Sequence, residues 1–355
     1  MNWKSYKKYF KGKKILITGN SGFVGSYLSL TLSLLGSKIL GYSLRKKDNR
    51  YLSNFSDYKR KIKTITADIR NIETYQNTII KFKPDILIHL ASQPLVSESY
   101  IKTKTNYETN VMGTVKLFEI AKKIKSLKNI MIFTSDKVYK NLDKKSLNEN
   151  SPLGGEDPYS ASKSAQDLIS NSYKLSFFKK KKNIFLIRAG NIIGGGDWEK
   201  SRLIPDLFLS NFNKKNIYLR NPNATRPWQH ILDVVEGILR LLSIKGKKMS
   251  EKSYIYNIGP KSNKDLKVKH LIQKFTDNAP YIKIKYKFKN INFIEKKFLK
   301  LSSKLIMKDI NWKSRLSIND AIKLTSKWYY EFFKNKKQII NFTSQQIEFF
   351  LKKNI

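Results

Sequence analysis

Short apolar runs and longer amphipathic stretches alternate along the first 190 residues of the chain. Strands that alternate with helices of roughly 10 to 20 residues form βαβ crossovers, so this pattern predicts a parallel sheet with helices on both faces. The expected fold is a Rossmann-type, doubly wound α/β fold. Strands are predicted at residues 13–18, 38–42, 62–67, 86–90, 129–134 and 184–188, and helices at 23–35, 71–82, 106–122 and 158–178.

The alternation ends after residue 188, where a glycine-rich loop at 191–198 (NIIGGGDW) and an irregular segment at 220–230 (RNPNATRPWQH) follow. A helix at 230–244 and a strand at 254–258 are then expected to return to the sheet. We predict a dinucleotide-binding domain of residues 1–190 plus about 229–260. A smaller, discontinuous α/β substrate lobe is predicted from residues 191–228 plus about 261–355, with a helix capped by Ser317 that runs to about Phe333.

A glycine-rich turn with GxxGxxG spacing joins the first strand to the first helix. Glycine is needed where the backbone turns sharply and where a pyrophosphate approaches main-chain N–H groups, and the helix N-terminus offers further donors to the anion. The turn therefore predicts a nicotinamide dinucleotide site. Its expected residues are Gly19, Ser21, Gly22, Phe23, Val24 and Gly25.

The end of the second strand lacks the acidic residue that usually binds the adenosine ribose. Ser43 is the expected ribose ligand there, whereas Arg45 and Lys46 would suit a 2′-phosphate, so NAD is expected and NADP stays an alternative. Asp68 and Ile69, after the third strand, are expected near the adenine, although Asp68 would serve equally well as a helix cap. Residues after the fourth strand are expected to border the nicotinamide and the sugar, namely Leu90, Ala91, Ser92, Gln93 and Leu95.

Tyr159 and Lys163 form a YxxxK pair at the start of a predicted helix, where positions i and i+4 share one face. An ammonium beside a phenol stabilises the phenolate, so we expect Lys163 to lower the pKa of Tyr159 and make it a general base toward a sugar hydroxyl. Ser135 follows the fifth strand at the carboxyl edge of the sheet, where ligands bind in open sheets. It is expected to hydrogen-bond the same reacting oxygen.

Several longer segments resemble the nucleotide-sugar 4,6-dehydratases of the extended short-chain dehydrogenase family, and most closely the branch that acts on CDP-glucose. The matching segments are GNSGFVGSYLS at 19–29, HLASQPLV at 89–96, NVMGTVKL at 110–117, TSDKVY at 134–139, PLGGEDPYSASK at 152–163, RAGNIIGGGDW at 188–198, RLIPD at 202–206 and RPWQHI at 226–231. The resemblance covers nearly the whole chain. The GGGDW and RPWQH blocks are its most specific parts.

The resemblance implies a closed redox cycle. Tyr159 would deprotonate the glucose C4 hydroxyl while hydride passes from C4 to NAD. Loss of the C5 proton and the C6 hydroxyl would follow, and hydride would return to C6. Asp136 is the expected acid for the leaving hydroxyl. Many relatives have Asp-Glu at this place, whereas this chain has Asp136-Lys137, so Lys137 is expected either as the C5 base or as a contact that orients the substrate.

Two smaller departures concern the phosphate turn, where Asn20-Ser21 and Val24 stand in place of the His-Thr and Lys expected in the CDP-glucose branch. They weaken the nucleotide assignment but leave the dehydratase assignment intact. An epimerase or an NADP-dependent reductase on the same scaffold remains an alternative. The Asp136-Lys137 pair argues against it, because epimerisation at C4 needs no acid for a leaving group at C6.

The substrate side is expected to combine backbone and arginine contacts to the sugar diphosphate. Asn191 and the glycines at 194–196 would let backbone N–H groups approach, and Arg220 and Arg226 would clamp phosphates. His89 and His230 are expected to be structural rather than catalytic, although His230 is also a candidate for substrate contact. The full set of predicted substrate-binding residues is Gln93, Ser135, Asn191, Arg202, Leu203, Ile204, Arg220, Arg226 and His230.

Basic residues outnumber acidic ones by 70 to 27, which gives a formal net charge of +43. Such a charge suits an anionic partner, but the lysines are scattered along the chain, which favours a coding bias. We expect no nucleic-acid or membrane partner, and an inactive basic scaffold that binds RNA is a remote alternative. The absence of cysteine excludes disulfides and zinc-thiolate sites, and no metal is expected.

The expected compartment is the cytoplasm, since the first ten residues contain no continuous apolar stretch and no signal peptide is expected. The family resemblance also implies a homodimer that pairs the long helices at 106–122 and 158–178. It implies, too, a product that supplies a deoxy sugar for polysaccharide biosynthesis.

Overall fold

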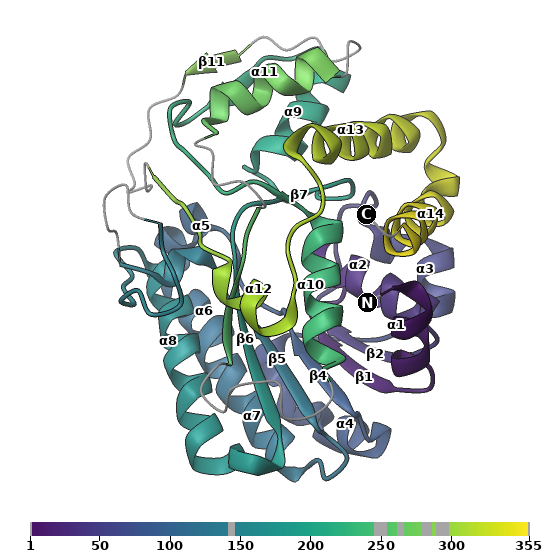
Figure 1. Cartoon of the computed structure of the whole chain (residues 1–355), viewed down its shortest axis with the longest axis vertical. Helices are drawn as coiled ribbons and strands as arrows, with labels where there is room; N and C mark the ends of the chain where they lie inside the picture. The colour runs from purple at the N-terminus through teal and green to yellow at the C-terminus, as the bar shows by residue number, and fades with distance from the viewer. Residues whose placement is uncertain are drawn as a thin grey trace.

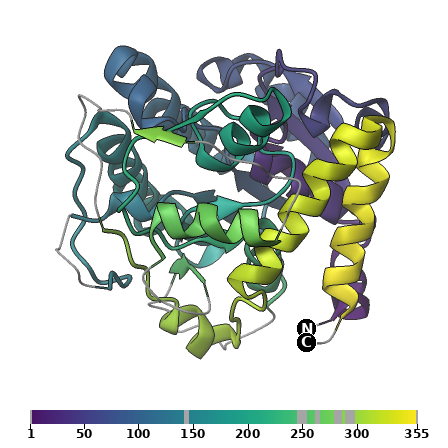
Figure 2. The same ribbon diagram turned by 90° about the horizontal axis from the view of Figure 1, so that it is seen from above.

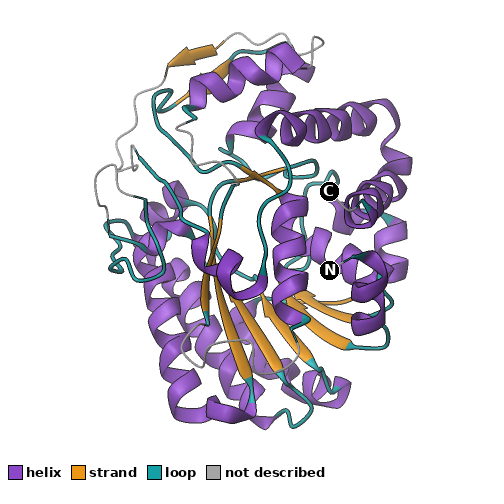
Figure 3. Cartoon of the chain, viewed as in Figure 1, coloured by secondary structure: helices purple, strands orange, loops and turns teal. Residues whose placement is uncertain are grey.

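The computed structural model describes residues 2–140, 146–244, 254–260, 266–278, 286–288 and 298–353. Its central sheet has seven parallel strands in the order β10-β6-β5-β4-β1-β2-β3 (Figures 1 and 3). The strand order reverses between β1 and β4, which is the point where open α/β sheets bind ligands. The strands are β1 (Lys14–Thr18), β2 (Lys38–Ser43), β3 (Lys63–Thr66), β4 (Ile86–His89), β5 (Asn129–Phe133), β6 (Asn183–Ala189) and β10 (Ile255–Ile258).

Helices cover both faces of this sheet because successive residues of each strand point to opposite sides. In β1, Ile15 and Ile17 belong to one buried cluster and Leu16 belongs to the other. The first cluster lies under α1 (Trp3–Phe10), α2 (Phe23–Leu34), α10 (Ile231–Leu242) and α14 (Ile339–Lys352). The second lies under α4 (Gln76–Phe82), α7 (Gly113–Lys123) and α8 (Pro158–Tyr173). The predicted doubly wound fold is therefore confirmed.

Three of the predicted helices are present but less regular than expected. A π-helical turn at Glu108–Met112 separates α6 (Thr103–Tyr107) from α7, and α8 ends in another at Lys174–Phe178. The predicted helix at 71–82 is a 3-10 segment at Ile69–Tyr75 followed by α4, with a kink at Asn71. The strand predicted at 254–258 returns to the sheet as β10, which pairs with β6.

Several short elements were not predicted from the sequence. One of them, α1, lies against α14, where Lys352 Nζ is 5.5 Å from the ring of Trp3, and both ends of the chain lie on this side of the molecule (Figure 2). The unpredicted helices are α1, α3 (Ser56–Lys61), α5 (Val96–Ile101), α9 (Leu203–Phe212), α11 (Val268–Asn278), α12 (Lys304–Ile310) and α14.

The helices α9 and α11 lie above the carboxyl edge of the central sheet, together with two small sheets (Figure 1). There β8 (Ile217–Leu219) pairs with β11 (Tyr286–Phe288), and β7 (Ile192–Ile193) pairs with β9 (Gln229–His230). The helix predicted after Ser317 is confirmed as α13 (Ile318–Asn335), with the Ser317 side chain accepting from the Asp320 N–H. The predicted domain boundary near 260 adjoins residues 261–265, which lie outside the described residues.

Candidate active site

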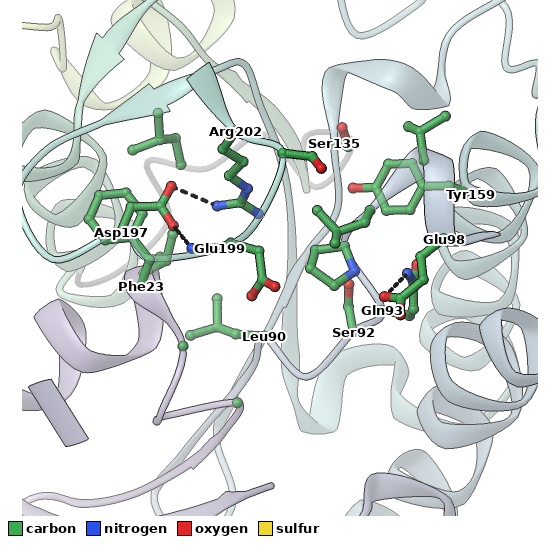
Figure 4. A pocket seen from close by; sticks show the side chains of 18 of the residues that line it. Phe23, Leu90, Ser92, Gln93, Glu98, Ser135, Tyr159, Asp197, Glu199 and Arg202 are labelled. Carbon is green, nitrogen blue, oxygen red and sulfur yellow. Dashed lines mark hydrogen bonds and ion pairs between the residues drawn. The ribbon is translucent and has the colours of Figure 1, made fainter. Parts of the chain in front are cut away.

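A cavity of about 700 Å³ opens at the carboxyl edge of the sheet. It runs from the glycine-rich turn after β1, past the ends of β4 and β5, to α9 and β8 (Figure 4). The predicted site residues line it, with the exception of Gly195, Gly196 and His230. We describe it as a cofactor arm at the glycine-rich turn, a centre at the end of β5 and a substrate arm at α9 and β8.

At Gly19 and Gly25, the glycine-rich turn leaves no room for a side chain. Gly19 has a φ of +76°, and a Cβ atom there would lie 2.7 Å from the Ala91 nitrogen. A Cβ on Gly25 would lie 2.1 Å from the Gly19 carbonyl oxygen. Gly22 is the N-cap of α2 and has no capping side chain, so the first N–H groups of the helix face the cavity without a side-chain acceptor. This cradle fits a dinucleotide pyrophosphate.

At the end of β2, Ser43 stands where an acidic residue usually binds the adenosine ribose, and it pairs with Ser21 of the glycine-rich turn. The hydroxyl groups of Ser21 and Ser43 are hydrogen-bonded to each other, and Ser43 also accepts from the Ser21 N–H at 3.3 Å. Asp68 lines the cavity and is also a cap, because its Oδ1 accepts from the Arg70 N–H at 2.9 Å. The position of Asp68 therefore fits both a helix cap and a contact with the adenine. Ile69, Phe23 and Val24 complete this arm.

At the end of β5, the side chains of Ser135 and Tyr159 face each other across the cavity (Figure 4). Ser135 Oγ also donates to Asp136 Oδ1 at 3.1 Å and accepts from the Lys137 N–H at 3.2 Å. Lys137 Nζ lies 6.0 Å from the centre of the Tyr159 ring. The fold thus brings together the four polar groups that the sequence placed at this edge.

The start of α8 holds Tyr159 in position. Asp157 is the N-cap and accepts from the Ser160 N–H at 2.9 Å, Pro158 follows it in the first turn, and the Tyr159 N–H donates to Ser99 Oγ at 3.1 Å. Burial raises the pKa of Tyr159 to about 12, and a hydrogen bond to Ser135 opposes that shift. The expectation that Lys163 lowers this pKa is not met.

Lys163 is buried, and its ammonium donates to Gln166 Oε1 at 3.0 Å and to the Phe133 carbonyl at 3.3 Å. Burial lowers the pKa of Lys163 to about 7. Its side chain lines the cavity on the same helix face as Tyr159, as the spacing predicted. Desolvation is the largest influence on the pKa of both Tyr159 and Lys163, because both side chains are buried.

The residues after β4 form the wall between the centre and the cofactor arm. Leu90, Ala91, Ser92 and Gln93 line the cavity. Gln93 is fixed on three sides: its N–H donates to Asn110 Oδ1 at 2.8 Å, its Oε1 accepts from Asn106 at 2.8 Å, and its Nε2 donates to Glu98 at 3.2 Å (Figure 4).

On the substrate arm, Arg202 forms an ion pair with Asp197, with 3.0 Å between Nη1 and Oδ2 (Figure 4). Arg220 Nη2 donates to the Ser201 carbonyl at 2.7 Å, and buried Arg226 donates to the Thr225 carbonyl at 3.0 Å. The other predicted substrate residues that line this arm are Asn191, Leu203 and Ile204.

His230 is one of the predicted residues that the structure does not bring to the cavity. It is buried at the N-cap of α10, where its Nδ1 accepts from the Leu232 N–H at 3.3 Å, and it does not line the cavity. The expectation that it is structural fits this position, and its assignment as a substrate contact is corrected. His89 is also buried, between the hydroxyls of Thr18 at 2.6 Å and Thr114 at 3.0 Å.

The role predicted for the glycines at 194–196 is also corrected in part. Gly194 lines the cavity, but Gly195 and Gly196 do not. A Cβ on Gly195 would lie 1.9 Å from Trp328 Cγ, so glycine is needed there for packing against α13 rather than for contact with a diphosphate.

Sequence reasoning missed several polar residues of the cavity. They are Glu98, Asp197, Glu199, Asp206 and Tyr218. Asp197 and Asp206 lie inside the quoted GGGDW and RLIPD blocks, which offered a signal for them. Glu199 forms an ion pair with Lys46 at 3.2 Å, across the cofactor arm, and nothing in the sequence indicates that pairing.

A family model described as GDP-mannose 4,6 dehydratase matches residues 16–325. The chain belongs to this family of nucleotide-sugar 4,6-dehydratases. The dehydratase is 34% identical to a CDP-glucose 4,6-dehydratase from Salmonella typhimurium, over 94% of its own length and 95% of that protein's. The family assignment made from the sequence, and with it the class of hydro-lyase, is confirmed.

Solved structures share the fold of the dehydratase. One is a dTDP-glucose 4,6-dehydratase from Bacillus anthracis in complex with NAD, with a TM-score of 0.76 and 22% identity, covering 92% of this chain and 98% of the other. Another is a UDP-glucose 4-epimerase from Bifidobacterium longum in complex with NAD+ and UDP, with a TM-score of 0.80 and 21% identity, covering 92% and 99%.

Two further observations concern the described part of the dehydratase. None of its helices there combines the length and apolar character needed to cross a bilayer. Nor do the described residues contain a group of three or more His, Asp or Glu side chains arranged to hold a metal ion.

Proposed function

We propose that this dehydratase converts CDP-glucose to CDP-4-keto-6-deoxyglucose and water, with NAD as its bound cofactor. The observation that carries the proposal is the arrangement of Ser135, Asp136, Lys137 and Tyr159 around one point at the end of β5. The choice of CDP-glucose is supported by the relative from Salmonella typhimurium, which is a CDP-glucose 4,6-dehydratase and matches over nearly the full length of both chains.

The cofactor arm fits a dinucleotide that binds with its pyrophosphate at the N-terminus of α2 and its adenosine between Ser43 and Asp68. Bound NAD would supply a positively charged ring that favours the Tyr159 phenolate, and it would take up hydride from C4 and return it to C6. Lys46 faces Glu199 rather than open space, and Arg45 is exposed and does not line the cavity. These positions favour NAD over NADP.

Tyr159 is assigned as the general base for the C4 hydroxyl, because it faces Ser135 at the centre of the cavity. Ser135 would donate a hydrogen bond to the same oxygen as charge develops on it. Lys163 is assigned to the cofactor ribose and to the electrostatics of Tyr159. Burial lowers the pKa of Lys163. A ribose oxygen that accepted a hydrogen bond from its ammonium would oppose this effect and favour the protonated form.

Asp136 is assigned as the acid that protonates the C6 hydroxyl as it leaves. It is 4% exposed and receives a hydrogen bond from Ser135, so it lies beside the group that contacts C4. Lys137 extends toward the face of Tyr159 and is assigned as the C5 base. Removal of the C5 proton by Lys137 and loss of the C6 hydroxyl would yield water and the unsaturated ketone. Hydride returned to C6 from the bound cofactor, together with the proton returned to C5 by Lys137, would then give the 4-keto-6-deoxy product.

We further propose that the two segments predicted as a substrate lobe bind the nucleotide sugar, through Arg202, Arg220 and Arg226. The remaining chain would hold the cofactor. A homodimer through α7 and α8 is supported by exposed apolar side chains on that side. Leu168 on α8 and Leu175 in the π-helical turn that follows it are 61% and 58% exposed.

A product assay tests the proposal. Purified protein, without added reductant, is incubated with CDP-, dTDP-, UDP- and GDP-hexoses, and the products are analysed by mass spectrometry for loss of one water. Loss from CDP-glucose alone is expected. Loss from another nucleotide sugar would keep the reaction and overturn the nucleotide, whereas no loss from any of them, with NAD shown bound, would overturn the dehydratase function and favour an epimerase or reductase.

A further inference from the structure

A group of three residues, which we term the distal corner, lines the end of the substrate arm. It consists of Asp206 in the first turn of α9, Tyr218 on β8 and Arg220 directly after β8. If the proposed function holds, the cofactor lies in the cofactor arm and the reacting sugar lies at Tyr159. The distal corner is then the part of the cavity left for the nucleobase and the phosphate next to it.

The backbone of Ser201 holds two members of the distal corner together. Ser201 has a φ of +60°, a left-handed conformation that is unfavourable for a residue with a Cβ atom. In this conformation its carbonyl accepts from Arg220 Nη2 at 2.7 Å, and its backbone N–H favours the charged form of the Asp206 carboxyl. A strained residue that fixes an acid and a guanidinium beside a cavity is typical of a binding site.

The carboxyl group of Asp206 has no part in the chemistry proposed at the centre. It is half-buried, and burial raises its pKa to about 6 while Arg220 opposes the shift, so it is ionised at neutral pH. An ionised carboxylate only accepts hydrogen bonds. It therefore favours a base edge that presents a donor and repels one that presents an oxygen.

Pyrimidine bases differ at this edge. Cytosine has an exocyclic amine at C4, to which aspartate and glutamate are matched acceptors, whereas uracil and thymine carry an oxygen at the same place. Tyr218 is 59% exposed and lines the same end of the cavity, so its ring offers a flat surface on which a base can stack. We propose that Asp206 is the residue that selects cytosine, by accepting a hydrogen bond from the base's exocyclic amine.

The test measures nucleotide binding rather than turnover. NAD-loaded protein is titrated with CDP and with UDP by isothermal calorimetry, for the wild type and for Asp206→Asn and Asp206→Ala. The wild type is expected to bind CDP at least about tenfold more tightly than UDP. In Asp206→Asn this ratio should fall by about tenfold or more, and UDP should bind more tightly than in the wild type, because the amide can donate to the uracil oxygen. In Asp206→Ala, CDP should weaken while UDP stays unchanged.

Asp277→Asn is the matched control, because Asp277 is an exposed acid on α11 that does not line the cavity. Its CDP-to-UDP ratio should equal that of the wild type. If both Asp206 variants keep the wild-type melting temperature and the wild-type CDP-to-UDP affinity ratio, the inference is overturned. The proposed function still stands in that case, provided that the wild type dehydrates CDP-glucose. A wild type that dehydrates only dTDP- or UDP-glucose overturns the proposed nucleotide and this inference together.

Discussion

Lys46 Nζ lies 3.2 Å from Glu199 Oε2, and this ion pair joins the loop after β2 to the loop before α9. The Tyr51 hydroxyl donates to the same oxygen at 3.2 Å, and the Arg50 guanidinium lies 4.7 Å from the Trp198 ring. Both loops line the cavity, so these contacts tie the cofactor arm to the substrate arm.

We expect Glu199→Gln to speed the dissociation of NAD by about two- to fivefold. The pair is partly exposed, and such pairs contribute roughly 0.2–1 kcal/mol. Stopped-flow displacement of bound NAD measures the rate. Glu348→Gln is the control, since it breaks the exposed pair with Lys352 on α14. Equal rates for wild type and Glu199→Gln would mean that the ion pair does not help to retain the cofactor.

Tyr159→Phe removes only the phenolic oxygen that faces Ser135. Turnover of CDP-glucose should fall by about 10²- to 10⁴-fold, the usual contribution of a positioned general base, while NAD binding stays within about twofold of the wild type. Steady-state assay and calorimetry give the two values. Turnover within tenfold of the wild type would remove Tyr159 from the proposed role.

Asp136→Asn separates oxidation from dehydration. The amide keeps the shape and can still accept from Ser135, but it cannot protonate a leaving hydroxyl. Reduced nicotinamide should therefore accumulate and be visible by absorbance when CDP-glucose is added, without loss of water in the mass spectrum. A variant that releases the dehydrated product at the wild-type rate would show that the acid lies elsewhere.

The sequence predicted the sheet well because strands buried on both faces read as continuous apolar runs, such as KILIT at 14–18. Helices outside the sheet were harder to predict. Both α11 and α14 have an apolar face at helical spacing, so the sequence offered a signal for them that the predicted helices do not include. The central site was predicted because its residues follow strand ends, where topology alone brings them together.

Other features depended on contacts that a sequence does not contain. The need for glycine at 195 comes from Trp328, which is distant along the chain, and the pairing of Lys46 with Glu199 crosses between two loops. The spacing of Tyr159 and Lys163 correctly put them on one helix face. It did not reveal that burial and Gln166 would govern the charge of Lys163.

Asp167 on α8 and Arg188 on β6 form a buried ion pair, with 2.5 Å between Oδ2 and Nη2. Asp167→Asn should reduce the free energy of unfolding by about 3–5 kcal/mol, because it leaves the guanidinium buried without its counter-charge. Urea denaturation measures the change. Asp57→Asn, which breaks an exposed pair with Arg60, should cost less than about 1 kcal/mol. Similar losses for the two variants would contradict the prediction.

His89 should make the protein less stable in acid. Burial, with a smaller effect of Lys163, lowers its pKa to about 3, whereas an unfolded histidine titrates near about 6.5. Between these values the unfolded chain binds a proton that the folded protein does not, so stability is lost as the pH falls, by about 1.4 kcal/mol per pH unit from this one group. Above pH 6.5 both states are neutral, and the effect disappears.

His89→Gln isolates the contribution of His89 to the loss of stability in acid. Glutamine keeps a donor and an acceptor for Thr18 and Thr114 but does not titrate. Urea denaturation at pH 7.5, 6, 5 and 4 should show the variant less stable than the wild type at pH 7.5 and the difference narrowing steadily toward pH 4. His270→Gln, at an exposed position on α11, should leave the pH dependence as it is in the wild type. A constant difference between His89→Gln and wild type across this range would mean that His89 is protonated in the folded protein, and burial would then not control its charge.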